Sequence, residues 1–102
     1  MTYYWEHELL EDNTGNRDGD AFDVSAFSSF LVYVEHVFGA GSIVTTVQGR
    51  QKGSSNWVPL QTFNTDGDNT LAVDNYGWYE VRVVTSSAVN PATSEADISG
   101  EV

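Results

Sequence analysis

The feature that most constrains the fold is a two-residue alternation of side chains that recurs between Phe22 and Arg82. It is clearest in residues 30–38 and 43–48, which are separated by the turn formers Gly39-Ala40-Gly41-Ser42. A period of two is typical of a β-strand, because successive side chains of a strand point to opposite faces of a sheet. Clusters of Gly, Ser and Asn between such segments are typical of tight turns. The stretch therefore predicts an antiparallel β domain.

The whole chain predicts an all-β protein, a single antiparallel β-sandwich or jelly-roll-like domain of about seven to eight short strands. The expected strands are residues 7–12, 22–25, 30–38, 43–48, 57–63, 71–73, 78–85 and a weak last strand at 96–102. Residues 13–20 and 64–69 consist largely of turn formers and charges, so we expect loops there. The strand at 30–38 is largely apolar on both faces, which predicts a central strand covered on both sides. Pro59 cannot donate to a β-ladder, so it predicts an edge or a bulge.

The charge of the chain limits the partners that it can bind. Fifteen Asp and Glu residues stand against four Lys and Arg residues, which gives a formal net charge of −11. Because such a surface repels phosphate backbones, we expect no nucleic-acid partner. The sequence has no apolar run of membrane-spanning length and no signal-peptide pattern, so we expect no membrane partner and synthesis in the cytosol.

The sequence shows no reactive constellation. His7 and His36 lack metal-ligand spacing, and we expect one exposed and one partly buried histidine rather than a zinc site. The segment Asp66-Gly67-Asp68-Asn69-Thr70 lacks the glycine and the acid that a calcium loop needs at its sixth and twelfth positions, although a loose calcium site there or at Asp18 and Asp20 stays open. With no cysteine and no serine at a nucleophile elbow, we expect no enzyme, no cofactor and no metal.

Aromatic residues near the predicted strand ends raise a different possibility, a carbohydrate-binding module that stacks rings on sugars. Alternation places Trp57 and Tyr79 in the core. Trp78 alternates with Glu80 and Arg82, so we expect it to be exposed and suited to a subunit contact.

The order of motifs resembles that of small tailed-phage structural proteins. The matching segments are Ala21–Phe27, Gly41–Val44, Val47–Arg50, Ser54–Leu60 and Tyr79–Val83. In that group a strand reading like FDVSGY leads into a hairpin, an EGSNDGxNW turn and a closing YxVRV strand. The likeness spans roughly residues 9–85, and the tail after Thr85 is unmatched.

This resemblance implies a virion structural protein. A free-standing acidic chain without a fibre-like repeat is most similar to a capsid decoration or cement protein. The implied location is the outer surface of a phage head, the implied partner is the major capsid protein, and the implied state is a homo-oligomer, with a trimer favoured. The alternative is a carbohydrate-binding module or a tail or fibre module that acts at the host surface.

Two regions are expected to meet the partner. Residues 1–6 would form an N-terminal aromatic arm ahead of a β-sandwich domain at residues 7–102. The turn at Arg50-Gln51-Lys52 carries much of the positive charge at a place where the resembled group usually has Ser-Asn-Asp. Arg82 is expected beside Glu80 or a neighbouring acid. The full set of predicted partner-binding residues is Tyr3, Tyr4, Trp5, Arg50, Lys52, Trp78 and Arg82.

Overall fold

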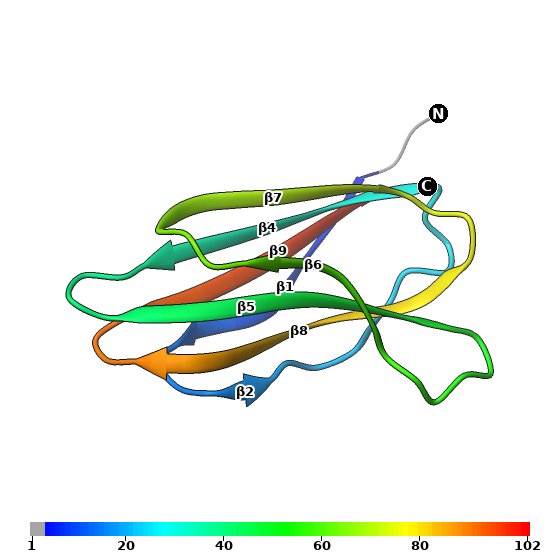
Figure 1. The fold of residues 1–102 in the computed structure, drawn as a ribbon. Helices are drawn as coiled ribbons and strands as arrows, with labels where there is room; N and C mark the ends of the chain where they lie inside the picture. Colours follow the sequence, from blue (N-terminus) through cyan, green and yellow to red (C-terminus); the bar gives the residue numbers. More distant parts are fainter. Residues whose placement is uncertain (1–3) are drawn as a thin grey trace.

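The structure, a computed structural model, describes the backbone of residues 4–102 and the side chains of residues 6–11 and 13–102. Within this part of the chain, nine strands form two antiparallel sheets that pack face to face (Figure 1). The strands are β1 (Tyr4–Asn13), β2 (Arg17–Asp18), β3 (Phe22–Asp23), β4 (Ser29–Val37), β5 (Ser42–Gln51), β6 (Val58–Phe63), β7 (Gly67–Asp74), β8 (Trp78–Val89) and β9 (Thr93–Glu101). The predicted β-sandwich is confirmed. The described residues include no helix that is long and apolar enough to cross a membrane.

Each sheet has two long central strands. The first sheet, called sheet A, has the order β1-β9-β4-β7. The second, called sheet B, has the order β2-β8-β5-β6, and β3 also pairs with β8. As expected, β6 is an edge strand, and the register between β5 and β6 shifts between Val47 and Gln48 near Pro59. A proline there removes no ladder hydrogen bond that a central strand would need.

The core lies between the sheets and is built from alternate positions of their strands. On β4, Val32 and Val34 have no exposed surface, whereas Leu31 and Val37 are 40% and 55% exposed. The prediction that β4 is covered on both sides is therefore wrong. A sandwich of two sheets buries only one face of each sheet, so the other apolar positions of β4 face outward.

A chain of buried polar groups crosses this core. The ring of His36 on β4 donates from Nδ1 to the Thr65 carbonyl oxygen at 2.8 Å. Its Nε2 lies 2.8 Å from Thr45 Oγ1 on β5, and that hydroxyl lies 2.7 Å from Ser94 Oγ on β9. His36, Thr45 and Ser94 are all buried, so the chain fixes the two sheets against each other. His7 is exposed and stacks on Phe22, which confirms the expectation of one exposed histidine, whereas the expectation of a partly buried one is wrong because His36 is fully buried.

Four strands differ from the sequence predictions in their bounds or their place in the sheets. The expected weak last strand is β9, which lies between β1 and β4 in the middle of sheet A. The short strand β2 lies within the expected loop at 13–20, and β7 begins within the expected turn at 64–69. Strand β1 begins at Tyr4, so the backbone of residues 4–6 pairs with β9 instead of preceding the sheet. The first three residues, Tyr3 among them, lie outside the described part of the chain.

Candidate partner-binding surface

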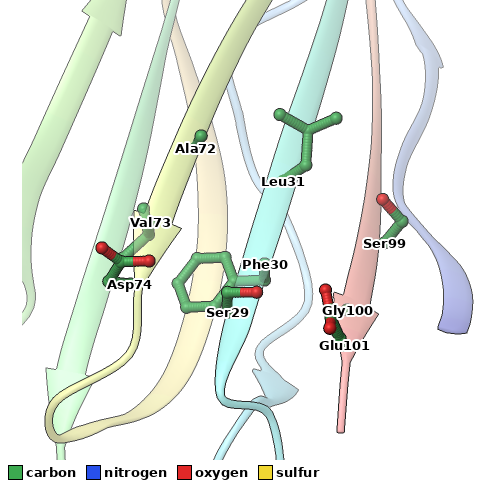
Figure 2. Close-up of a pocket in the computed structure, with 9 residues that line it drawn as sticks. All are labelled: Ser29, Phe30, Leu31, Ala72, Val73, Asp74, Ser99, Gly100 and Glu101. Atoms are coloured by element: carbon green, nitrogen blue, oxygen red, sulfur yellow. The ribbon is translucent and has the colours of Figure 1, made fainter. Parts of the chain in front are cut away.

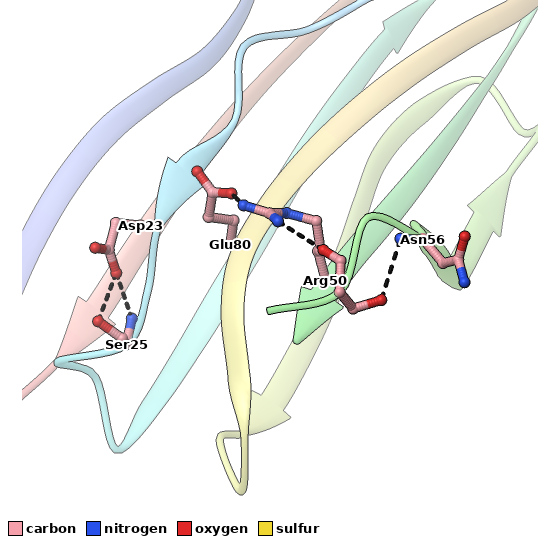
Figure 3. Close-up of polar contacts among 6 residues, drawn as sticks. Asp23, Ser25, Arg50, Asn56 and Glu80 are labelled. Carbon is pink, nitrogen blue, oxygen red and sulfur yellow. Dashed lines mark hydrogen bonds and ion pairs between the residues drawn. The ribbon is translucent and has the colours of Figure 1, made fainter. Parts of the chain in front are cut away.

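Arg50, a predicted partner-binding residue, is held by contacts within its own chain. It lies near the end of β5, and its guanidinium forms an ion pair with Glu80 on β8. Its Nη1 donates a hydrogen bond to the Ser54 carbonyl oxygen at 2.6 Å (Figure 3). Its guanidinium carbon lies 5.7 Å from the ring centroid of Trp57 and 5.8 Å from that of Tyr79. Arg50 therefore anchors the turn after β5 to the outer side of sheet B.

Arg82 makes a second cation–π contact with the same tryptophan. Its guanidinium carbon lies 4.4 Å from the Trp57 ring centroid, and its Nε donates to Gln48 Oε1 at 2.8 Å. The predicted pairing of Arg82 with Glu80 is wrong, because the register of β5 and β8 places Gln48 opposite Arg82 and Arg50 opposite Glu80. Together the two arginines hold Trp57 on the outer side of sheet B.

Trp78 is not the exposed aromatic residue that alternation predicts. Its half-buried side chain packs against the core, and a Cβ added at Gly49 would lie 2.7 Å from its ring. The cause is a β-bulge, since the pairing of β5 with β8 passes from Arg50 to Gln51 while skipping Tyr79 on β8. One extra residue reverses the alternation beyond it. Trp78 consequently faces the core.

The prediction that Trp57 and Tyr79 are core anchors is also wrong, and the bulge at Tyr79 accounts for the second of these residues. Both rings lie near the guanidinium of Arg50, and neither belongs to the core cluster of the described residues. Both side chains are half-buried. Their contacts with Arg50 join the turn at residues 52–57 to sheet B.

Lys52 is the exposed member of the predicted cationic pair. It borders a shallow hollow together with Ser25, Phe27 and Trp78. Nearby, Asp23 accepts hydrogen bonds from the Ser25 hydroxyl at 2.6 Å and the Ser25 backbone N–H at 2.8 Å (Figure 3). These bonds lower the pKa of Asp23, and the attraction of Lys52 adds a smaller lowering. The side chain of Lys52 is therefore exposed at the surface of sheet B, close to Asp23.

The predicted aromatic arm is described only in part. Tyr3 lies outside the described residues, and so do the side chains of Tyr4 and Trp5. The backbone of Tyr4 pairs with Glu101, and that of Trp5 pairs with Gly100. That these aromatic side chains bind a partner stays a prediction.

The contacts of Arg82 predict a moderate effect on stability. The substitution Arg82→Gln removes the cation–π contact and the hydrogen bond to Gln48, so we expect the free energy of unfolding to fall by about 1 kcal/mol. Arg17→Gln is a matched control on sheet B, because the Arg17 side chain is exposed and its loss changes the net charge equally. Urea denaturation of both variants tests this expectation. Equal shifts in the two variants would contradict the stabilising role of Arg82.

Three carboxylates on sheet A are close enough to share a cation. Glu8 on β1 and Glu95 and Asp97 on β9 bring one oxygen each within 4.8 Å of the others. Carboxylate oxygens are ligands that Ca²⁺ prefers. The grouping arises from pairing between distant segments, since Glu8 lies opposite Asp97 in the sheet. No local spacing in the sequence therefore predicts this group of three carboxylates.

The outward side of sheet A, here called the acidic face, is a surface feature that the sequence pattern alone does not reveal. Its four strands contain no Lys or Arg. Register places eight carboxylates on this side: Glu6, Glu8, Glu35, Asp68, Asp74, Glu95, Asp97 and Glu101. The signal in the sequence is the alternation of acids with apolar residues in segments that lack any cation. This alternation predicts a shared acidic surface only when the four strands are known to lie side by side in one sheet.

Tyr33 lies on the acidic face and is bound to one of its carboxylates. Its hydroxyl donates a hydrogen bond to Asp68 Oδ1 at 2.6 Å, and Glu35 Oε2 lies 3.4 Å away. The hydrogen bond to Asp68 stabilises the neutral phenol, and the nearby negative charges oppose its ionisation. The hydrogen bond to Asp68 is the largest cause and desolvation the second; with the charges of Asp68 and Glu35 they raise the pKa of Tyr33 to about 12 from an ordinary value of 10.0.

We therefore expect the phenol of Tyr33 to remain protonated at about pH 10, where an ordinary tyrosine is half ionised. The substitution Asp68→Asn should bring its titration midpoint down towards that ordinary value, because it removes the charge that most opposes ionisation. The measurement is the difference in tyrosinate absorbance between each protein and its Tyr33→Phe derivative. An unchanged midpoint in Asp68→Asn would contradict the assignment.

Comparisons with known proteins identify a solved structure with the same fold. No protein-family model and no curated protein matches the sequence. Among solved structures, the chain is similar to the SPBc2 prophage-derived protein YomS, with a TM-score of 0.79 and 11% sequence identity. The likeness covers 100% of this chain and 96% of that protein. At this identity, the two proteins are shown to share the β-sandwich fold.

Proposed function

We propose that this protein is a structural component of a tailed-phage virion, a decoration protein that binds the major capsid protein on the outer surface of the head. The observation that carries the proposal is the full-length likeness in fold to a prophage-derived protein. The resemblance of residues 9–85 to small tailed-phage structural proteins supports it independently, since it rests on side-chain motifs rather than on backbone geometry.

The proposed mechanism is adhesion and not catalysis. A two-sheet sandwich offers two broad outer faces, and side chains on both faces are already fixed by contacts such as those of Arg50 and Tyr33. A surface that is ordered before binding loses little conformational entropy when it meets a partner. We propose that copies bind as a trimer at symmetric positions of the shell, where the contacts of several copies add by avidity.

Capsids with and without the protein test this proposal. Heads that lack the protein should release their DNA at a lower temperature than complete heads, and addition of the purified protein should restore the original temperature. The protein should also co-sediment with the depleted heads. Depleted heads that neither bind the protein nor change in thermal stability would overturn the proposal.

A further inference from the structure

We infer that the acidic face of sheet A is a docking surface for a cationic protein surface, which presents Lys or Arg side chains to its carboxylates. The inference goes beyond a general role in the virion because it assigns the contact to one face and gives the chemistry of the partner. The identification of this partner with the capsid rests on the proposed function.

The first argument is the separation of charge between the two sheets. All four cations of the chain belong to strands of sheet B or the turn after one of them: Arg17, Arg50, Lys52 and Arg82. The acidic face of sheet A carries eight carboxylates. Some of them lie directly opposite each other on neighbouring strands: Glu8 is opposite Asp97, and Glu35 is opposite Asp68. Like charges directly opposite each other destabilise a sheet. A partner that supplies positive charge would relieve this repulsion.

The second argument is the shape of the face around Leu31. This side chain is 40% exposed and stands on β4 between Ala72 of β7 and Ser99 of β9 (Figure 2). A shallow hollow of about 500 Å³ lies beside it and is lined by Glu6, His7, Glu8, Leu31, Tyr33, Asp97, Ile98 and Ser99. A second hollow of about 420 Å³ also includes Leu31 and has Asp74 and Glu101 in its lining.

Each hollow combines apolar side chains with carboxylates. This combination suits Lys and Arg, because their aliphatic stems pack on apolar surface while their charged ends reach an anion. A neutral apolar partner would leave the carboxylates desolvated without compensation, which is costly. The geometry therefore favours a cationic side chain over a purely apolar one.

A second copy of this chain does not fit the face. Two acidic faces brought together would place eight carboxylates against eight carboxylates, so this face repels the same face of another copy. Two of the four cations that a copy could offer are engaged internally, since Arg50 pairs with Glu80 and Arg82 lies over Trp57. A nucleic acid is excluded by its own negative charge. The occupant is thus a different protein with a basic surface.

Two double variants test the location of the contact. The face variant combines Glu35→Gln with Asp97→Asn, and the control variant combines Asp18→Asn with Asp20→Asn at exposed positions in and after β2, in the sheet B layer. Both remove two negative charges. Binding is measured in low salt by the fluorescence anisotropy of a labelled octalysine peptide, and by co-sedimentation with depleted heads. Circular dichroism confirms that each variant is folded.

The face variant should bind octalysine about tenfold more weakly than the unmodified protein, and the control variant should change by less than about twofold. In the unmodified protein, amide NMR shifts on addition of octalysine should cluster on β1, β4, β7 and β9, which keeps the test valid even if a variant fails to fold. Equal weakening in both variants, or shifts clustered on sheet B, would overturn the inference.

The remaining outcomes separate the two proposals. Depleted heads that bind the control variant but not the face variant would support both. Heads that bind both variants equally would overturn the inference and leave the capsid role standing. If the unmodified protein binds no heads, the capsid role fails while the octalysine result still decides the inference. If Ca²⁺ alone produces the shifts on the acidic face and octalysine produces none, an ion and not a protein is the occupant, and the inference is overturned.

Discussion

Replacing His36 with leucine is expected to lower the free energy of unfolding by about 3 kcal/mol, because the Thr65 carbonyl oxygen and the buried Thr45 hydroxyl each lose a hydrogen bond and the fully buried imidazole is removed. The Thr65 carbonyl oxygen and the Thr45 hydroxyl each lie 2.8 Å from a ring nitrogen of His36. A carbonyl oxygen can only accept, so Nδ1 carries the hydrogen in that contact. Leucine fills much of the space but supplies neither a donor nor an acceptor. Urea denaturation monitored by circular dichroism measures the change.

A triple variant separates the polar chain from simple packing. His36→Leu combined with Thr45→Val and Ser94→Ala removes all three hydrogen-bonded side chains between the sheets, so none of them is left without its partner. Removing both partners of a buried hydrogen bond costs less than removing one. The triple variant should therefore be less destabilised than the sum of its single variants. A loss below about 1 kcal/mol in His36→Leu alone would show that these hydrogen bonds contribute little.

Replacing Gly100 with alanine is expected to destabilise the protein by a similar amount, about 3 kcal/mol. Gly100 lies on β9 with the ring of Phe27 directly above it, and an added Cβ would overlap that ring. Phe27 is only 8% exposed and contacts Phe22 at the same end of the sandwich. The ring cannot move away without opening a gap in the core, so the cost includes lost packing as well as the clash.

Gly15→Ala is the matched control for this substitution. Nothing lies within 4 Å of a Cβ added at Gly15, so the change should alter stability by no more than about 0.5 kcal/mol. The double variant Gly100→Ala with Phe27→Ala should be more stable than the sum of the two single effects predicts, since each substitution makes room for the other. Additive effects would show that Phe27 does not pack on Gly100.

The strands with strong alternation were predictable from the sequence. The segments at residues 30–38, 43–48 and 57–63 correspond closely to β4, β5 and β6, because β-branched and aromatic residues dominate them. Strand β9 was harder to predict. Three of its four core-facing positions hold Ser94, Ala96 and Gly100. Small residues are needed there to accommodate the Phe27 ring and the polar chain through Ser94, and they give a weak hydrophobic pattern.

The candidate surface was less predictable than the fold, for two physical reasons. A β-bulge that skips Tyr79 reverses the faces of Trp78 and its neighbours, and a period-two pattern carries no record of such a bulge. The acidic face joins residues from four strands that are far apart in the chain. Glu8 and Asp97 are neighbours only because β1 pairs with β9, a pairing that a single sequence does not reveal.

The outer surfaces of the two sheets differ in their charged side chains. On sheet B, contacts with Arg50 and Arg82 tie the turn at residues 52–57 to its own sheet. On sheet A, carboxylates surround the exposed side chain of Leu31, and the strands supply no cation to balance them. The sequence predicts partner contacts at residues 1–6 and on the turn after β5, whereas the contact that we propose lies on the acidic face of sheet A.

Immunogold electron microscopy of virions purified from the phage that encodes this chain tests the central proposal most directly. An antibody raised against the purified chain should place gold particles over the outer surface of the heads. The same preparation from a phage with the gene deleted should show none. Gold confined to tails or fibres, or virions that contain none of the protein, would contradict the assignment as a capsid decoration protein.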